Sequence, residues 1–176
     1  AGLMKKILVS DFTLRQSAAN HTVVSFREKT AIAKCLDALG VNTIELAAPK
    51  AGKEDCIVNR TIASVVRRAA VAIPAGFSEE ETDAAWECIK DAANPCLQVI
   101  VPTSTVQMEY TYHMKSDKML AKIGELVAAA KGYCADVEFS ALDATRADED
   151  FLIAAVKEAE EKGATVITLC DDAGVS

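Results

Sequence analysis

Short apolar runs alternate along this chain of 176 residues with longer segments in which apolar residues recur every three or four positions. The short runs are rich in Val, Ile and Leu, and they predict six strands that begin roughly 26 to 39 residues apart, about the length of one strand-plus-helix unit. The predicted strands are residues 7–10, 43–46, 71–75, 97–101, 136–140 and 166–170.

The segments between the strands carry the start and stop signals of helices. Ser25 and Glu28 have the spacing of a capping box, and Gly40 supplies a left-handed stop. Ser78 and Glu81 repeat the box before a helix that holds Trp86, which we interpret as a packing residue. The apolar face predicted for the first of these helices is Ile32, Cys35, Leu36 and Leu39. Two further helices are predicted over residues 116–133 and 148–162.

Regular alternation of strands and helices predicts an α/β fold, a parallel sheet with helices outside it. Two architectures compete, an open doubly wound sheet and a TIM (β/α)8 barrel. No strand is followed by the Gly-x-Gly-x-x-Gly loop that supports a dinucleotide-binding sheet. A barrel needs eight strands and we count six, so the chain is either about six βα units of a barrel or an open sheet. Either way we expect one domain over residues 1–176, with residues 1–3 a cloning remnant before a native start at Met4.

Composition and charge narrow the classes of partner. Hydrophobic residues make up 51% and charged residues 26%, as in a globular protein. The net charge of −7 argues against a nucleic-acid partner. No apolar run approaches the roughly 20 residues that span a bilayer, and no secretory leader is recognisable, so we expect a cytoplasmic protein with no membrane partner.

The cysteines and histidines have no metal-site spacing. We interpret the cysteines as buried or half-buried thiols in a reducing cytosol, with neither disulfides nor a structural zinc ion. They are Cys35, Cys56, Cys88, Cys96, Cys134 and Cys170. His21 and His113 are far apart in the sequence, and we interpret both as ordinary loop residues.

In both architectures the functional residues lie at the carboxyl ends of the strands. Asp11 and Arg15 follow strand one, while Glu45 and Glu138 stand inside apolar strands, where a charge is costly unless it is paired. We expect Arg15 to pair with one of the two glutamates, either as a structural ion pair or as an anion clamp with acid/base function. Other polar residues at these ends are Thr103, Ser104, Gln107, Ser140, Asp143, Arg146, Asp171 and Asp172.

Several ordered motifs resemble the DRE-TIM metallolyase (HMGL-like) family, which includes 2-isopropylmalate synthase, homocitrate synthase and HMG-CoA lyase. Residues 11–15, Asp-Phe-Thr-Leu-Arg, resemble the start of the family's Asp-Thr-Thr-Leu-Arg-Asp-Gly-Glu-Gln. Residues 137–146, Val-Glu-Phe-Ser-Ala-Leu-Asp-Ala-Thr-Arg, are very close to its Val-Glu-Phe-Ser-Ala-Glu-Asp-Ala-Thr-Arg. Residues 28–45 are similar to its first helix and second strand, and residues 101–110 to its fourth-strand loop. The two synthases match better than the lyase.

The resemblance implies a barrel in which a divalent metal (Mg, Mn or Zn) chelates a 2-oxo acid. Acetyl-CoA, the co-substrate, loses a methyl proton, its enolate attacks the ketone, and the thioester is then hydrolysed. Arg15 matches the family's catalytic arginine, Glu45 the glutamate of its name, and Glu138 an active-site glutamate of strand five. Substrate-binding side chains are expected at Thr103, Gln107 and Ser140, and the protein is expected to be a homo-oligomer.

The departures from the family pattern cluster at the expected site. Gln16 replaces the metal-binding aspartate, residues 17–19 replace Gly-Glu-Gln, Leu142 stands for a glutamate and Asp172 for a threonine. The His-x-His pair expected on strand seven is not within the sequence. Asp172 is a speculative replacement ligand, although a helix cap is its commoner role. Two functions therefore compete: an acetyl-CoA-dependent Claisen condensation, and an inactive barrel that serves as a binding or regulatory module. Six units leave sheet edges that we expect to be exposed.

Overall fold

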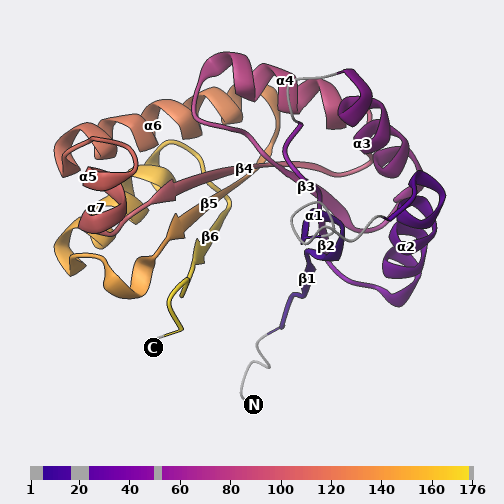
Figure 1. Cartoon of the computed structure of the whole chain (residues 1–176), viewed down its shortest axis with the longest axis horizontal. Coiled ribbons are helices and arrows are strands. Elements are labelled where there is room, and N and C mark those ends of the chain that lie inside the picture. The colour runs from indigo at the N-terminus through magenta and orange to yellow at the C-terminus, as the bar shows by residue number, and fades with distance from the viewer. Residues whose placement is uncertain (1–5, 17–23, 50–52, 175–176) are drawn as a thin grey trace. The chain divides into compact units, whose positions relative to one another are not determined.

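The computed structural model of this chain describes residues 6–16, 24–49 and 53–174 (Figure 1). The expected remnant at residues 1–3, the start at Met4, the departures at 17–19 and His21 all lie outside these residues. The chain forms two compact units. The first unit is Ala1–Ile73 with Glu87–Pro95, and the second unit is Pro74–Trp86 with Cys96–Ser176.

The first unit consists of short parallel strands, each followed by a helix. Its strands are β1 (Ser10–Asp11), β2 (Thr43–Glu45) and β3 (Ala70–Pro74), and its helices are α1 (Thr13–Gln16), α2 (Phe26–Leu39) and α3 (Lys53–Val65). Ser10 lies opposite Thr43 across β1 and β2, and Ile44 lies opposite Val71 across β2 and β3. The core of this unit includes Ile44, Leu46, Ile62, Val66 and Val71.

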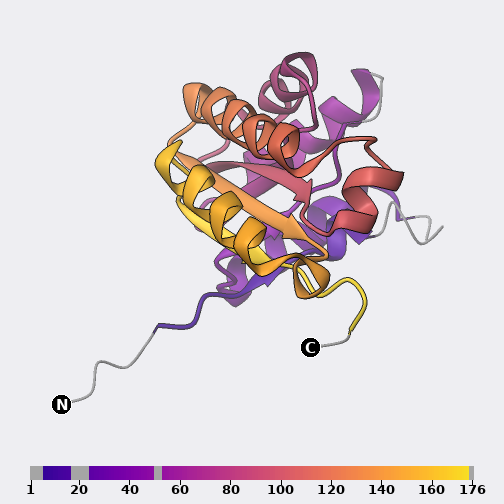
Figure 2. The same ribbon diagram turned by 90° about the vertical axis from the view of Figure 1, so that its left-hand side faces the viewer.

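The second unit holds the longer strands and helices. Its strands are β4 (Pro95–Pro102), β5 (Asp136–Leu142) and β6 (Val166–Leu169), and a 3-10 turn follows β5 at Ala144–Arg146. Its helices are α4 (Glu79–Ile89), α5 (Thr105–Tyr110), α6 (Ser116–Tyr133) and α7 (Glu149–Glu161). Helix α4 begins in this unit and ends in the first one. Helices α6 and α7 pack side by side and each contacts β5 (Figure 2). Leu97, Val99, Met119, Ile123 and Phe139 are buried there.

The strand order is β1-β2-β3-β4-β5-β6, and every strand pair whose register is described is parallel. A strand order that follows the chain without reversal is that of a TIM barrel, whereas a doubly wound sheet reverses at its switch point. The prediction of a partial TIM barrel is confirmed, and the open doubly wound alternative is set aside.

Most predicted elements appear where the sequence pattern placed them. The helix predicted over residues 116–133 is α6, and α7 begins after its cap at Asp148. Ser25 and Glu28 form the expected capping box of α2, and Gly40 ends that helix with φ of 89°. Glu81 donates its backbone N–H to Ser78 Oγ, but its carboxylate accepts from Phe77 N, not from Ser78 N.

The prediction of strand one over residues 7–10 is wrong in its position. Ile7, Leu8 and Val9 are 84%, 63% and 53% exposed, and the regular strand comprises only Ser10–Asp11. The backbone oxygen of Val9 accepts from Asn42 N and Thr43 N, so pairing begins only there. The apolar character of these residues predicted burial that the described residues do not provide.

The buried face of α2 also differs from the prediction. Ala33 and Asp37 are buried, whereas Cys35 and Leu39 are exposed. The face of α2 that carries Asp37 is turned inward, because the Asp37 carboxylate accepts hydrogen bonds from the backbone N–H groups of Arg67, Arg68 and Ala69 at 2.8–3.0 Å. Burial opposes its ionisation, but these hydrogen bonds outweigh burial and hold the pKa of Asp37 below its usual value.

The cysteines are free thiols with varied exposure. Cys88, Cys96 and Cys134 are buried, and burial raises the pKa of Cys96 to about 12. The exposed Cys35 contradicts the expectation that all six would be at least half-buried. None of the described helices has the combined length and hydrophobicity of a bilayer-spanning segment.

Candidate active site

A hydrogen-bonded cluster joins β1, α1 and β2 in the first unit. Ser10 Oγ donates to Glu45 Oε1 at 2.7 Å, and Arg15 Nη1 donates to Glu45 Oε2 at 3.1 Å. Asp11 accepts from Thr13 N at 3.0 Å and from Thr13 Oγ1 at 3.2 Å, which fixes the turn that starts α1. The short helix therefore carries Arg15 back to the end of β2.

The predicted pairing of Arg15 is confirmed for Glu45. The two side chains are 35% and 16% exposed, so the pair is only partly shielded from solvent. A guanidinium has five N–H donors, and the described pair uses one of them. Ser10 donates to one oxygen of the Glu45 carboxylate and Arg15 donates to the other. This arrangement suits a glutamate that positions the arginine better than one that acts as a free base.

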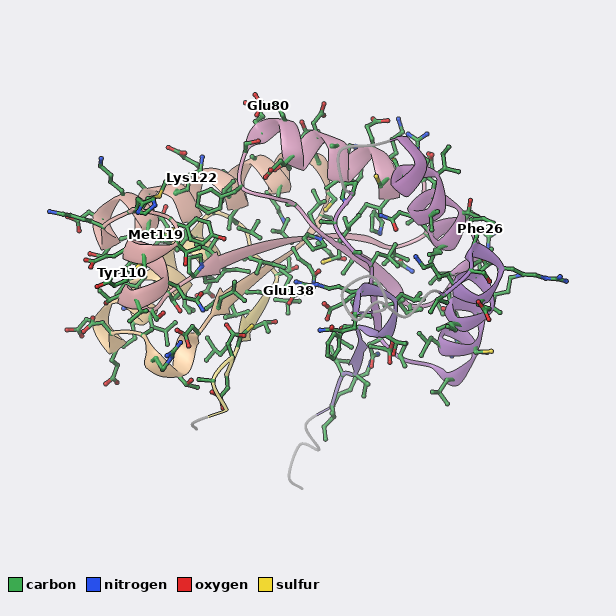
Figure 3. All side chains as sticks on the ribbon, viewed as in Figure 1. Phe26, Glu80, Tyr110, Met119, Lys122 and Glu138 are labelled. Carbon is green, nitrogen blue, oxygen red and sulfur yellow. The ribbon has the colours of Figure 1, made fainter. Side chains whose placement is uncertain are left out.

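A second cluster lies on one face of β4, β5 and β6 in the second unit. The sheet register places Gln98 opposite Glu138, and Ser140 opposite Thr168. Because side chains two residues apart on a strand share a face, all four point to the same side. Glu138, labelled in Figure 3, is only 9% exposed.

The carboxylate of Glu138 accepts three hydrogen bonds from uncharged groups. Ser140 Oγ and Thr168 Oγ1 donate to Oε1 at 2.9 and 2.7 Å, and Gln98 Nε2 donates to Oε2 at 2.9 Å. Neutral donors thus compensate a nearly buried charge. The sequence pattern predicts Glu138 and Ser140 as site residues but not Gln98 or Thr168. A glutamine inside the apolar strand 97–101 is a signal of the same kind as Glu138.

The expected substrate-binding residues Thr103 and Gln107 lie at the end of β4 and in α5. Thr103 is buried, and its hydroxyl donates to the backbone oxygen of Leu142 at 2.8 Å. Gln107 is half-buried, and its backbone N–H donates to Ser104 Oγ at 3.3 Å. The third expected residue, Ser140, donates its hydroxyl proton to Glu138. The hydroxyl protons of Thr103 and Ser140 are therefore used within the protein.

The loop after β5 is fixed by acidic side chains. Asp143 is fully buried with φ of 55°, and Arg146 Nε and Nη2 each donate to its carboxylate at 2.7 Å. The hydrogen bond from Arg146, followed by one with Ser104, holds the pKa of Asp143 below its usual value. Asp172 Oδ2 accepts from the backbone N–H of Asp143 at 2.8 Å, which ties the end of β6 to the loop after β5.

The described residues do not fit the divalent metal of the resembled family. Residue 16 carries an amide, which is a poorer ligand for a hard divalent ion than a carboxylate. The carboxylates of Asp11, Glu45 and Asp172 are hydrogen-bonded inside the protein. Within residues 6–16, 24–49 and 53–174, no group of three His, Cys, Asp or Glu side chains is arranged to hold a metal. No chemical step is therefore assigned to a metal here.

The motifs, the strand order and the strand-end carboxylates agree with a match to a known family. The family model described as HMGL-like matches residues 6–176. The chain belongs to the HMGL-like family. It is 34% identical over 173 residues to the 2-isopropylmalate synthase of Clostridium kluyveri, an alignment that covers 98% of this chain and 34% of that protein. The chain thus spans about a third of the length of that relative.

Solved structures support the fold of this HMGL-like chain. The hydroxymethylglutaryl-CoA lyase of Pseudomonas aeruginosa superposes with a TM-score of 0.75 at 16% identity, over 98% of this chain and 60% of the lyase. An HMG-CoA lyase from Acinetobacter baumannii, in complex with coenzyme A and 3-methylmalate, gives 0.71 at 17% identity, over 96% of this chain and 57% of that one. At these identities the likeness is one of fold.

Proposed function

We propose that this HMGL-like chain is part of a cytoplasmic, homo-oligomeric enzyme that condenses acetyl-CoA with a 2-oxo acid. The proposal is supported by the relatedness to 2-isopropylmalate synthase over 98% of the chain. The single observation in the structure that carries it is the Arg15–Glu45 pair at the carboxyl ends of two neighbouring strands. Ligands of parallel α/β folds bind at those ends.

Arg15 is the group that stabilises negative charge in this proposal. When the enolate of acetyl-CoA attacks the ketone of a 2-oxo acid, the ketone oxygen becomes an alkoxide. A guanidinium whose position is already fixed by Glu45 stabilises that charge without reorganising. The remaining N–H donors of its fork suit the oxygens of an oxo acid.

Glu138 is the base in the proposed cycle. Its carboxylate takes a methyl proton from acetyl-CoA to give the enolate, and the proton passes to the new alkoxide, which becomes a hydroxyl group. The bonds from Gln98, Ser140 and Thr168 fix the orientation of the carboxylate. Such positioning is what a general base requires, since proton transfer depends on geometry before basicity. Thr103 and Gln107 are substrate-binding residues in this proposal.

A second candidate function is a binding or regulatory module without catalysis. Gln16, exposed at the end of α1, favours it because this amide replaces the carboxylate that the family uses for its metal. An inactive module retains the barrel scaffold and the Arg15–Glu45 pair as an anion site.

Release of free CoA from acetyl-CoA tests the proposal. The full-length protein is mixed with acetyl-CoA and each of a panel of 2-oxo acids, with and without added manganese, and the thiol is followed colorimetrically. The enzyme hypothesis predicts thiol release that depends on one or more of the acids. No release with any acid, alongside measurable binding of an oxo acid by calorimetry, would favour the non-catalytic module.

A further inference from the structure

One buried polar atom distinguishes the cluster around Glu138. In the described part of the chain, Gln98 Oε1 is the only buried side-chain oxygen or nitrogen without a hydrogen-bond partner. Gln98 is 1% exposed and lies opposite Glu138 in the sheet. A buried acceptor left without a donor destabilises the fold, so its presence beside Glu138 needs an explanation.

The hydrogen bonds within this cluster leave mainly acceptors unused. Ser140 and Thr168 have one hydroxyl proton each, and both protons point at Glu138 Oε1. Gln98 donates an N–H of its amide to Glu138 Oε2, and this orientation turns its amide oxygen away from the carboxylate. The acceptors left over are the Gln98 amide oxygen, two hydroxyl oxygens and the Glu138 carboxylate.

This arrangement selects the kind of ligand. An oxo-acid carboxylate offers only acceptors and a negative charge, so the Glu138 carboxylate repels it. A small molecule with two protons to donate and a free lone pair is the complement of the site. Water has both properties, and buried water commonly satisfies such orphan groups.

We propose that Gln98 Oε1 and the Glu138 carboxylate hold the water that hydrolyses the thioester of the condensed product, an inference that rests on the proposed function. The water donates one proton to each, which leaves its oxygen lone pair directed at the thioester carbonyl. As the carbon–oxygen bond forms, Glu138 takes a proton from the water. The tetrahedral intermediate then breaks its carbon–sulfur bond, and the CoA thiolate takes that proton to leave as the thiol. Gln98 positions the water and Glu138 is its base.

The proposed enzyme performs condensation and hydrolysis in sequence, and these two steps depend on Gln98 to different extents. Condensation needs Glu138 and Arg15 but no water, whereas hydrolysis needs the water that Gln98 holds. Removing the Gln98 amide therefore slows the second event more than the first. The signature is a CoA thioester of the condensed acid that accumulates instead of being hydrolysed.

Gln98→Met, which is nearly isosteric, tests the inference in the full-length protein. Rapid quenching and mass spectrometry follow acetyl-CoA, the condensed acyl-CoA and the free acid over one turnover. We expect condensation to continue and hydrolysis to fall roughly 10²-fold, so that the acyl-CoA accumulates. Thr82→Val, which removes a buried hydroxyl from α4, is the matched control and should accumulate none.

A second variant separates water binding from positioning of Glu138. Thr168→Val removes one donor to Glu138 but keeps Gln98, so it should slow condensation and hydrolysis together without accumulation. Equal accumulation in Gln98→Met and Thr168→Val, or none in a folded Gln98→Met, would overturn the inference while leaving the proposed function standing. If Gln98→Met does not fold, Gln98→Asn replaces it, and a product distribution like that of the parent would count against the inference. A parent that consumes no acetyl-CoA overturns both proposals.

Discussion

At the residue scale, the strand-end carboxylates differ in what they are bonded to. Glu45 is held by Arg15 and Ser10, Glu138 only by uncharged donors, and Asp143 by both sides of the Arg146 fork. These differences assign a role to each: Glu45 orients a cation, Glu138 remains a carboxylate able to take a proton, and Asp143 fixes a loop.

Arg15→Lys tests the role of the guanidinium. A lysine keeps the charge but loses the planar fork, so kcat/KM for the oxo-acid-dependent release of CoA should fall about 10²-fold or more. Arg60→Lys is the matched control, because Arg60 forms a comparable but exposed pair with Glu87 in the same unit. Its kcat/KM should stay within a factor of about two of the parent value, since exposed ion pairs contribute little. Similar losses of kcat/KM in both variants would show that Arg15 has no specific role in the reaction.

Asp143→Asn tests the pH dependence of stability. The pKa of Asp143 is lowered in the folded state by the hydrogen bond from Arg146, so its contribution is complete above the unfolded-state pKa and is lost as pH falls through the folded value. The variant should therefore melt at a lower temperature than the parent near pH 7, and the gap should close below about pH 4. Asparagine tolerates the φ of 55°, so backbone strain does not confuse the comparison. Melting curves between pH 3 and 7 measure this, and a gap independent of pH would refute it.

The sequence allowed only part of this residue-scale description to be predicted. Arg15 and Glu45 were expected to pair because an isolated charge in an apolar strand needs a partner, and they do. Gln98 was missed because an amide in a strand carries no charge that demands explanation. Its importance depends on the register that sets it opposite Glu138, and register is a property of the sheet.

At the element scale, local signals predicted helix ends better than buried faces. The capping box at Ser25 and the left-handed Gly40 depend on a few neighbouring residues, and both are as predicted. The buried face of α2 depends instead on backbone N–H groups that lie some thirty residues later in the chain. These groups need a hydrogen-bond acceptor, and the Asp37 carboxylate provides it. No periodicity of apolar residues contains that information.

Two glycines provide an element-scale test. Gly40 has φ of 89°, and a methyl group on its Cα would meet open space, so Gly40→Ala should cost about 1–2 kcal/mol of unfolding free energy through backbone strain alone. Gly132 lies within α6 and also has open space, so Gly132→Ala should stabilise by roughly 0.5–1 kcal/mol. Urea titrations measure both changes. A Gly40→Ala variant as stable as the parent would contradict the left-handed helix end.

At the scale of the whole chain, the strand order and the family relation rest on signals spread over all six βα units. The six predicted strands and several ordered motifs that resemble the family together predict the barrel. The observed strand order agrees with this prediction, and so does the superposition on a lyase with a TM-score of 0.75. The division into two compact units was not predicted, because contact density depends on packing that periodicity does not encode.

In the described sheet β6 is the last strand of the order, which is where an exposed edge is expected. Val166, Ile167 and Leu169 are exposed there, and an exposed apolar edge strand favours pairing with another chain. We therefore expect this 176-residue polypeptide to associate at high concentration, and Ile167→Lys to reduce that association because an edge lysine opposes pairing. Sedimentation of both forms over a range of concentrations measures the effect. Ile153→Lys, at an exposed site on α7, is the control, and equal reduction by both would exclude the β6 edge as the cause.

In the proposed function, the full-length protein joins the methyl carbon of acetyl-CoA to the ketone carbon of a 2-oxo acid. Acetyl-CoA that carries three deuterium atoms on its methyl group, followed by mass spectrometry of the acid product, tests this most directly. We expect a 2-hydroxy acid enlarged by the acetyl unit that keeps two of the three deuterium atoms, because one is removed to form the enolate. Free acetate with all three deuterium atoms and no condensed acid would contradict it.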